Sequence, residues 1–284
     1  MSDNQSAHIN RPVLIDVDDI IAARGVKLPR FAVRMIKRFI HQDFLNAYFE
    51  KGDVGLDFAW GALKYLDVKV EVRGEENIPS EGLFTFAANH PLGGIDALSA
   101  VAVIGTRYEG KIRYVANGFL SNLTQLAEYM SSPIDKTSSH QALQMARDID
   151  EMFSSSNQML WFPAGACSRK IDGVIQDYEW QKTFITKSRD TGRSVIPVWI
   201  SGRNSWRFYF VDRLDRIFKT KFAMYCLPDE LYRGQHQTIT LIFGKPIPAE
   251  TFTRERKDKD WAQMVRSEVY KLKPDDYEKD HRRR

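Results

Sequence analysis

A repeated alternation of short apolar runs with longer amphipathic stretches constrains the fold of this chain more than any other feature. The apolar runs occupy residues 68–72, 83–88, 112–116, 158–162, 195–201 and 238–243. Short apolar runs of this kind, bounded by turn-forming residues, predict strands. Residues 141–153 carry apolar side chains at helical spacing and predict one of the helices between them. Strands that alternate with helices imply an α/β fold, here a single domain whose mixed, largely parallel sheet is flanked by helices.

The N-terminal part of the chain has a different pattern of apolar and charged residues, which predicts amphipathic helices over residues 30–49 and 55–66. Pro29 suits the start of the first helix, where its missing N–H is not needed. Basic side chains fall on one stripe of that helix and bulky apolar ones on the opposite side. The stripe comprises Arg30, Arg34, Lys37, Arg38 and His41, and the apolar side Phe31, Met35, Ile36, Phe39, Ile40 and Phe44. Such a helix fits an anionic membrane surface and, equally, ordinary packing with a solvated basic edge.

These textures divide the chain into four parts. Residues 1–28 form a polar lead with a short helix, and residues 29–67 a helical, membrane-facing element. Residues 68–253 form the α/β core, and residues 254–284 a charged helix followed by a basic tail.

The composition and charge of the chain exclude some classes of function but do not identify one. The 284 residues carry a formal net charge of +4 and two cysteines, Cys167 and Cys226. A mildly basic protein suits anionic lipid, an acidic carrier protein or nucleic acid. Two cysteines build neither a disulfide framework nor a metal-ligand set, and no stretch approaches the roughly 18 apolar residues that span a bilayer. Since the N-terminal residues are polar and acidic, we expect no signal peptide and a location on the cytosolic side.

The segment Asn89–Asp96 (NHPLGGID) carries the strongest chemical signal. It follows a predicted buried strand and precedes an apolar helix, and reactive groups gather at such strand ends in α/β sheets. The Gly93–Gly94 turn can return the carboxylate of Asp96 to the imidazole of His90. The carboxylate would then fix the imidazole tautomer, so that His90 can act as a general base. The competing interpretation is a buried histidine that only hydrogen-bonds the backbone.

A second segment, Phe162–Lys170 (FPAGACSRK), also follows a buried strand. Its hydroxyl and cations at Ser168, Arg169 and Lys170 suit a phosphate, although in isolation a solvated basic loop is the better interpretation. Lys136, in the PIDK segment that precedes residue 141, is a further candidate for an anionic substrate.

Taken in order, these segments resemble the glycerolipid and lysophospholipid acyltransferase superfamily over residues 68–247. Its Asn-His…Asp block is matched by Asn89, His90 and Asp96, and its Phe-Pro-Glu-Gly block by Phe162, Pro163 and Gly165. Two weaker blocks are matched by residues 134–136 and 196–200.

The sequence departs from the usual family pattern at two places. Five residues rather than four separate His90 from Asp96, and Ala164 stands where glutamate is usual. Cys167 stands near the usual arginine position, and the resemblance assigns the role of that arginine to Arg169, two residues later. These variants resemble the branch labelled putative hemolysins, which includes N-acyltransferases that make ornithine and glycine lipids. The resemblance favours transfer of a fatty acyl or 3-hydroxyacyl group to an amine; the alternative is O-acylation of a lysophospholipid or 1-acylglycerol-3-phosphate.

The resemblance also implies roles for residues and partners. His90 deprotonates the acceptor, Asp96 supports it, and the acceptor attacks a thioester of acyl carrier protein or coenzyme A. The remaining candidates for substrate binding are Asn89, Gly93, Gly94, Lys136, Phe162, Pro163, Gly165, Ser168, Arg169 and Lys170. No metal, other cofactor or nucleic acid is implied, and the protein is expected to contact an anionic membrane peripherally, on the inner face of the cell membrane.

Two other classes of protein remain as competing interpretations. One is a hydrolase that uses Cys167 or Ser168 as nucleophile, although the Gly-x-Ser-x-Gly pattern of serine hydrolases is absent around Ser168. The other is a membrane-binding module without catalysis.

Overall fold

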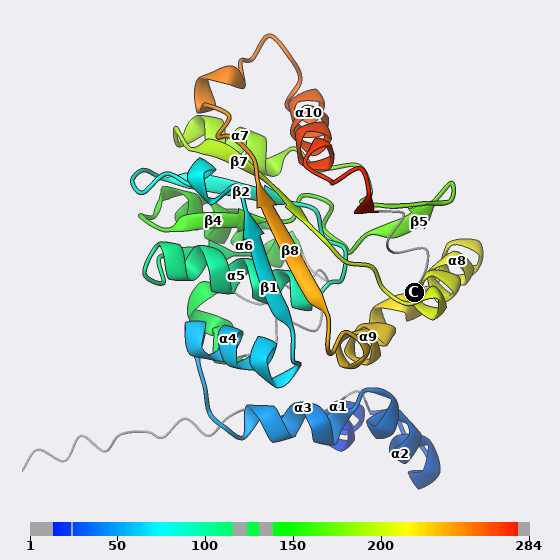
Figure 1. The fold of residues 1–284 in the computed structure, drawn as a ribbon. Helices are drawn as coiled ribbons and strands as arrows, with labels where there is room; N and C mark the ends of the chain where they lie inside the picture. The colour runs from blue at the N-terminus through cyan, green and yellow to red at the C-terminus, as the bar shows by residue number, and fades with distance from the viewer. Residues whose placement is uncertain (1–13, 24, 116–123, 131–138, 278–284) are drawn as a thin grey trace, which may run out of the picture.

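A six-stranded sheet forms the centre of the computed structural model, which describes residues 14–23, 25–115, 124–130 and 139–277 (Figure 1). The strand order is β1-β8-β7-β2-β4-β3, and neighbours pair in parallel except β7 with β8. The strands are β1 (Lys69–Arg73), β2 (Phe84–Ala88), β3 (Ile112–Tyr114), β4 (Gln158–Trp161), β7 (Ser194–Ile200) and β8 (Thr238–Phe243). The mixed, largely parallel sheet predicted from the sequence is therefore confirmed.

The direction of the central strands decides where loops meet. Strand β2 pairs in parallel with β4 on one side and β7 on the other, with Phe86 opposite Leu160 and Ile196. The carboxyl ends of these three strands therefore lie at the same edge of the sheet. The loops that follow β2, β4 and β7 meet there, although they lie far apart in the sequence.

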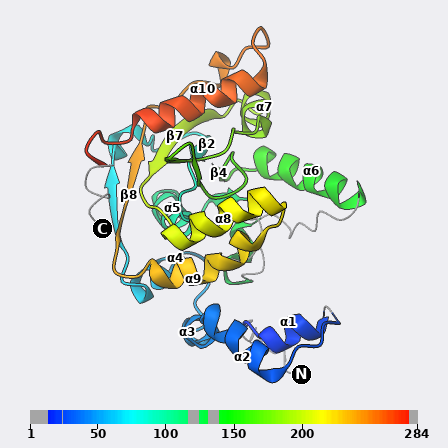
Figure 2. The same ribbon diagram turned by 90° about the vertical axis from the view of Figure 1, so that its right-hand side faces the viewer.

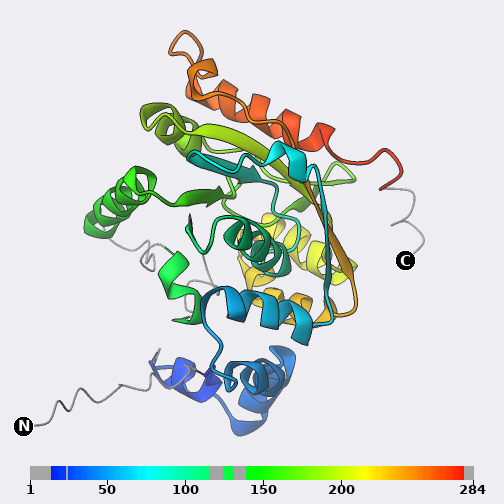
Figure 3. The same cartoon turned by 60° about the vertical axis from the view of Figure 1, so that its left-hand side comes forward.

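Helices cover both faces of the sheet, as the alternation of elements predicted (Figure 2). Helices α4 (Gly55–Tyr65) and α5 (Ile95–Arg107) pack on one face in the largest apolar cluster. Helices α7 (Thr183–Asp190) and α10 (Asp258–Lys271) pack on the other, around Trp180. Helix α6 (Ser139–Ser154) lies beside the sheet edge and contacts it through a small apolar cluster (Figure 3).

The N-terminal helices form a separate layer below α4 in Figure 1. They are α1 (Val17–Ala23), α2 (Arg30–Phe39) and α3 (Gln42–Phe49). The single helix expected over residues 30–49 is wrong, because the chain breaks at His41, whose φ is 54°. The His41 ring stacks on Tyr232 at 3.7 Å between centroids, and its Nε2 lies 2.8 Å from Asp229 Oδ1. Docking of this ring against α9 (Leu227–Arg233) accompanies the break.

Several described elements had no counterpart in the sequence prediction. Strands β5 (Arg169–Ile171) and β6 (Val174–Gln176) form a hairpin whose turn residues, Asp172 and Gly173, both have positive φ. Asp-Gly is a common hairpin turn, so this signal was present in the sequence. Helix α8 (Trp206–Phe218) begins at Ser205, whose hydroxyl accepts the Phe208 N–H, and leads to the 3-10 helix η4 (Phe222–Cys226). Among the described residues, no helix has both the length and the apolar character to cross a bilayer.

Candidate active site

The structure brings His90 and Asp96 together at the carboxyl end of β2. His90 Nδ1 lies 2.9 Å from Asp96 Oδ2, and the carboxylate is fully buried. The pairing predicted from NHPLGGID is therefore confirmed. Asp96 holds Nδ1 of the ring. The other ring nitrogen, Nε2, has no hydrogen-bond partner among the described residues and is therefore available to a substrate.

A tight turn produces this pairing across the six positions. Gly93 has φ +87°, and a Cβ there would approach Leu227 and Cys167, so glycine is required. Asp96 then lies in the first turn of α5, where the partial positive charge of the helix favours a carboxylate. The Leu92 N–H donates to Asp96 Oδ2 at 2.9 Å, which fixes the carboxylate against the turn.

The charges of the pair are set by competing effects. Burial alone lowers the pKa of His90, but the adjacent Asp96 carboxylate outweighs burial and raises the pKa of His90 above its usual value. Burial raises the pKa of Asp96, yet His90 and the backbone N–H groups of Leu92 and Gly93 together hold the pKa of Asp96 below its usual value. A buried carboxylate that stays ionised beside an imidazole stabilises the protonated form of that imidazole.

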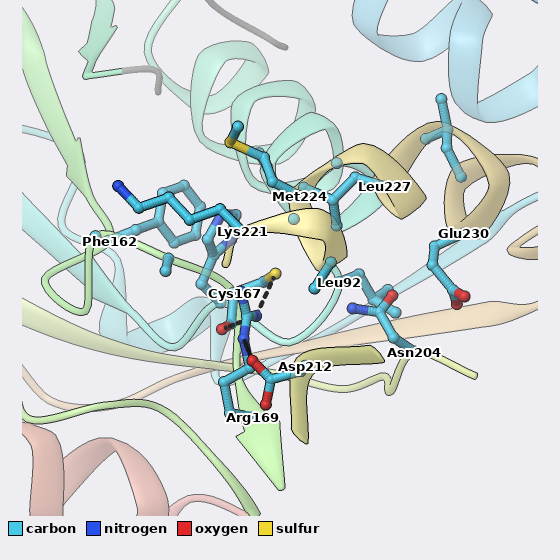
Figure 4. A pocket seen from close by; sticks show the side chains of 18 of the residues that line it. Leu92, Phe162, Cys167, Arg169, Asn204, Asp212, Lys221, Met224, Leu227 and Glu230 are labelled. Atoms are coloured by element: carbon cyan, nitrogen blue, oxygen red, sulfur yellow. Dashed lines mark hydrogen bonds and ion pairs between the residues drawn. The ribbon is translucent and has the colours of Figure 1, made fainter. Parts of the chain in front are cut away.

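His90 opens onto a pocket of about 470 Å³. Phe162 packs against the imidazole, with 4.2 Å between ring centroids, and Gly165 lines the pocket with φ +66° in the turn after β4. Apolar side chains make up much of the wall, namely Leu92, Ile95, Val115, Phe162, Ala223, Met224, Leu227 and Leu231. Figure 4 shows Met224 and Leu227 together on one part of this wall.

Four of the predicted substrate-binding residues do not line this pocket. The Asn89 side chain accepts from the Ile200 N–H at 2.6 Å and donates to the Ile200 carbonyl at 2.9 Å, so it joins the ends of β2 and β7. Pro163 is buried, and its carbonyl accepts the Gln181 N–H. Ser168 is buried and donates its backbone N–H to the carbonyl of His90 at 2.6 Å. Lys170 follows Arg169 in β5, where neighbouring side chains point to opposite faces, and it is exposed.

Arg169 does line the pocket, but it does so as part of an ion pair. Its Nε lies 2.7 Å from Asp212 Oδ1, and its Nη1 donates to the carbonyl of Cys167 at 2.6 Å (Figure 4). Asp212 Oδ2 also lies 3.4 Å from Arg216 Nη2, so this carboxylate is shared by two arginines that both line the pocket. Lys136 lies outside the described residues.

Three functional candidates were missed from the sequence. Asp177 is buried and accepts from the His90 N–H at 3.3 Å, from Ser168 Oγ at 2.5 Å and from Trp180 Nε1 at 2.9 Å. Asp212 pairs with Arg169 and Arg216, and Lys221 lines the pocket without a partner among the described residues. Asp212 and Lys221 sit in and after a helix that was not predicted, so no sequence signal placed them near His90.

Cys167 has the properties of a packed thiol. It is buried, and burial raises the pKa of its thiol above the usual value despite the nearby Arg169. Arg169 Nη1 donates to its Sγ at 2.9 Å. Because the thiolate is the nucleophilic form, these properties oppose the cysteine-hydrolase interpretation.

Comparisons with known proteins identify relatives of this chain. A family model described as acyltransferase matches residues 17–277. The lyso-glycine lipid O-acyltransferase of Bacteroides thetaiotaomicron is 44% identical over 267 residues, covering 91% of this chain and 97% of that protein. The enzyme of the same name from Phocaeicola vulgatus is 42% identical, with coverages of 91% and 95%. The crystal structure of the 1-acyl-sn-glycerophosphate (LPA) acyltransferase PlsC from Thermotoga maritima superposes with a TM-score of 0.50 at 18% identity, covering 90% of this chain and 88% of that chain, and shows a similar fold.

Proposed function

Because the chain belongs to the acyltransferase family, we propose that it transfers a fatty acyl group from a thioester to the hydroxyl of a lyso-glycine lipid, with His90 as general base. The observation that carries this proposal is the His90–Asp96 pair at the edge of an apolar pocket. The names of the relatives support the class of acceptor, and the His90–Asp96 pair supports general-base catalysis.

The proposed reaction is a direct transfer without an acyl-enzyme. His90 Nε2 takes the proton of the acceptor hydroxyl, and the oxygen attacks the thioester carbonyl. The tetrahedral intermediate collapses with cleavage of the C–S bond, and the leaving thiolate takes the proton back from the imidazolium. An ester and a free thiol result, so no metal or other cofactor is needed.

A donor for the oxyanion of the intermediate must lie close to His90. The N–H of Gly93 is already directed to the Asp96 carboxylate, which leaves the N–H of Gly94, also on the pocket wall, as the candidate. The apolar side chains along the same pocket suit the acyl chain.

The acceptor proposed here differs from the amine favoured by the sequence resemblance. Both relatives are named O-acyltransferases, which favours ester formation. A glycine acylated on its nitrogen keeps one carboxylate, and a 3-hydroxyacyl chain on that nitrogen offers the hydroxyl. The pocket cations suit an anionic headgroup such as this carboxylate: Arg169 and Arg216 share Asp212, and Lys221 has no partner among the described residues.

Parallel assays with purified protein test this proposal. Each reaction contains an acyl carrier protein thioester or an acyl coenzyme A, and one acceptor: N-(3-hydroxyacyl)glycine, free glycine, free ornithine or lysophosphatidic acid. We expect a diacylated glycine lipid from the first acceptor only, identified by mass spectrometry. An N-acyl product from a free amino acid would instead support the amine acceptor, and turnover of lysophosphatidic acid the phospholipid alternative.

Membrane contact through α2 belongs to the same proposal. Phe31 and Met35 are both 67% exposed, and helix α2 has no buried residue. Its apolar side is therefore free to meet lipid while the basic residues beside it meet anionic headgroups. A location on the inner face of the cell membrane follows as part of this proposal.

A further inference from the structure

Helix α8 buries both of its carboxylates, whereas several of its large apolar side chains are exposed. Its carboxylates, Asp212 and Asp215, point inward and are buried. Asp212 pairs with Arg169, and Asp215 accepts the backbone N–H groups of Phe222 and Ala223. A helix on the surface of a globular protein normally carries such groups on its solvent side.

Large apolar side chains occupy the outward side of α8 and continue into η4. Trp206 is 75% exposed, Phe218 69% and Phe222 62%. We call these residues together the α8–η4 surface; it comprises Trp206, Phe210, Leu214, Ile217, Phe218, Phe222, Met224 and Tyr225. Trp206, Phe210, Leu214 and Ile217 follow the helical repeat and form one stripe. A continuous patch of aromatic and aliphatic groups marks an interaction site.

The exposed charged side chains along α8 and up to the start of η4 all have one sign. Between residues 203 and 221 the only acidic residues are the buried Asp212 and Asp215, whereas the exposed charged side chains are basic. Among the described residues, none pairs with the side chains of Arg213, Lys219 or Lys221. Aromatic groups bordered by unpaired cations are complementary to the interface of an anionic bilayer.

The α8–η4 surface also borders the candidate active site. Lys221, Ala223 and Met224 line the pocket, and Phe222 and Tyr225 between and beside them are exposed. A bilayer on this surface would therefore meet the mouth of the pocket that contains His90.

Helix α2 lies on the same side of the molecule. Both α2 and α8 project to the right in Figure 1, and both face the viewer in Figure 2. Asp229 of α9 connects the two regions, since it accepts from Nε2 of His41, two residues after α2, and from Nη2 of Arg207 in α8, each at 2.8 Å. Two exposed apolar helices thus share one side of the fold.

We propose that the α8–η4 surface lies on an anionic phospholipid bilayer and delivers lipid substrate from the membrane to the pocket. The delivery step rests on the proposed function, whereas the binding to lipid does not. The α8–η4 surface and α2 together form one membrane-binding side, with the pocket opening on it.

Vesicle co-sedimentation of the full chain tests the binding. We expect binding to vesicles of phosphatidylglycerol and phosphatidylcholine, and weaker binding to phosphatidylcholine alone. The double variant F210E/I217E should bind the anionic vesicles on the order of tenfold more weakly, because charged groups replace the apolar stripe. The matched control is Leu83→Glu, which changes an exposed leucine just before β2, at the opposite edge of the sheet, and should bind like the wild type.

A second double variant changes only exposed side chains, so it leaves the fold intact. R213Q/K219Q removes two exposed cations and should weaken binding about fivefold per cation, on anionic vesicles only. In a parallel measurement, brominated phosphatidylcholine should quench tryptophan fluorescence in the wild type, and Trp206→Phe should lose part of that quenching.

Opposite results would overturn the proposal. Wild-type binding by both F210E/I217E and R213Q/K219Q would exclude the α8–η4 surface as the lipid contact. If light scattering showed that F210E/I217E splits a dimer while vesicle binding stays intact, the surface would be a contact between two copies. Acyl transfer to detergent-dispersed substrate is measured in a separate assay. A wild-type protein that shows no acyl transfer in this assay but still binds vesicles through the α8–η4 surface would contradict only the proposed function.

Discussion

At the scale of residues, the proposed chemistry depends on one hydrogen bond between the partly exposed His90 and the fully buried Asp96. Asp96 fixes the His90 tautomer and leaves Nε2 toward the pocket. Two neighbouring residues hold the backbone of His90, since the Ser168 backbone N–H donates to its carbonyl and the Asp177 carboxylate accepts its N–H. The site is therefore oriented by groups that do not themselves reach the pocket.

Removal of the imidazole gives the first prediction. His90→Ala should reduce kcat by about 10²- to 10⁴-fold, the contribution of a positioned general base. The control is His236→Ala, because His236 forms the same kind of 2.8 Å pair with Asp67 on the surface, where both side chains are exposed. Cys167→Ala should keep most of the activity. Loss of activity in Cys167→Ala with retention in His90→Ala would contradict the mechanism.

The pH dependence of activity gives the second prediction. The general base must be neutral, so kcat/KM should fall as the pH drops through the pKa of His90. Since Asp96 raises that pKa, the acidic limb should lie above the ordinary histidine value of about 6.5. In Asp96→Asn the largest remaining effect is burial, which lowers the pKa of His90 and opposes the weaker attraction of Asp177, so the limb should move to lower pH as kcat falls. A limb that stays in place in this variant would show that another group titrates.

Asn89 gives a prediction that separates structure from binding. Asn89→Ala removes two hydrogen bonds and leaves the buried N–H and carbonyl of Ile200 without partners. We expect a loss of about 2–4 kcal/mol in the free energy of unfolding, measured by urea denaturation. A substrate-binding role alone would instead raise KM at unchanged stability.

At the scale of elements, helix α2 exposes apolar side chains that we expect to contact lipid. Its outward apolar residues cannot be explained by packing, because none of its residues is buried. The double variant F31E/M35E should therefore weaken binding to anionic vesicles several-fold, with Leu83→Glu again as control. Unchanged vesicle binding would leave α2 as an ordinary surface helix. The measurement is vesicle co-sedimentation, so it is independent of catalysis.

In the hairpin β5–β6, strand geometry directs neighbouring side chains to opposite faces. Alternation along β5 turns Arg169 toward the pocket and Lys170 toward solvent. Side-chain type alone made both residues equal candidates for anion binding. The difference follows from strand geometry, which the Asp172–Gly173 turn sets.

At the scale of the whole molecule, Asp229 connects the N-terminal helices to the core. Its carboxylate accepts from His41, Arg207 and Arg233, and although burial raises its pKa, these partners hold the pKa of Asp229 below the usual value. Asp229→Ala should cost about 1–3 kcal/mol of stability and speed proteolysis between α3 and α4. Asp43→Ala, at an exposed position on α3, is the control. Equal proteolysis of both variants would contradict this role for Asp229.

The sequence alone determined the α/β class, the six strands of the main sheet and the His90–Asp96 pairing. These features depend on local patterns: periodicity marks strands and helices, and a Gly-Gly turn returns a carboxylate to a nearby imidazole. Only the tertiary structure decided which polar residues face the pocket and which hold its loops, because strand order joins segments more than a hundred residues apart, as Asn89 and Ile200 show. It also decided that α8 turns its carboxylates inward and Trp206, Phe210 and Phe218 outward, since Arg169, the partner of Asp212, lies on a distant hairpin.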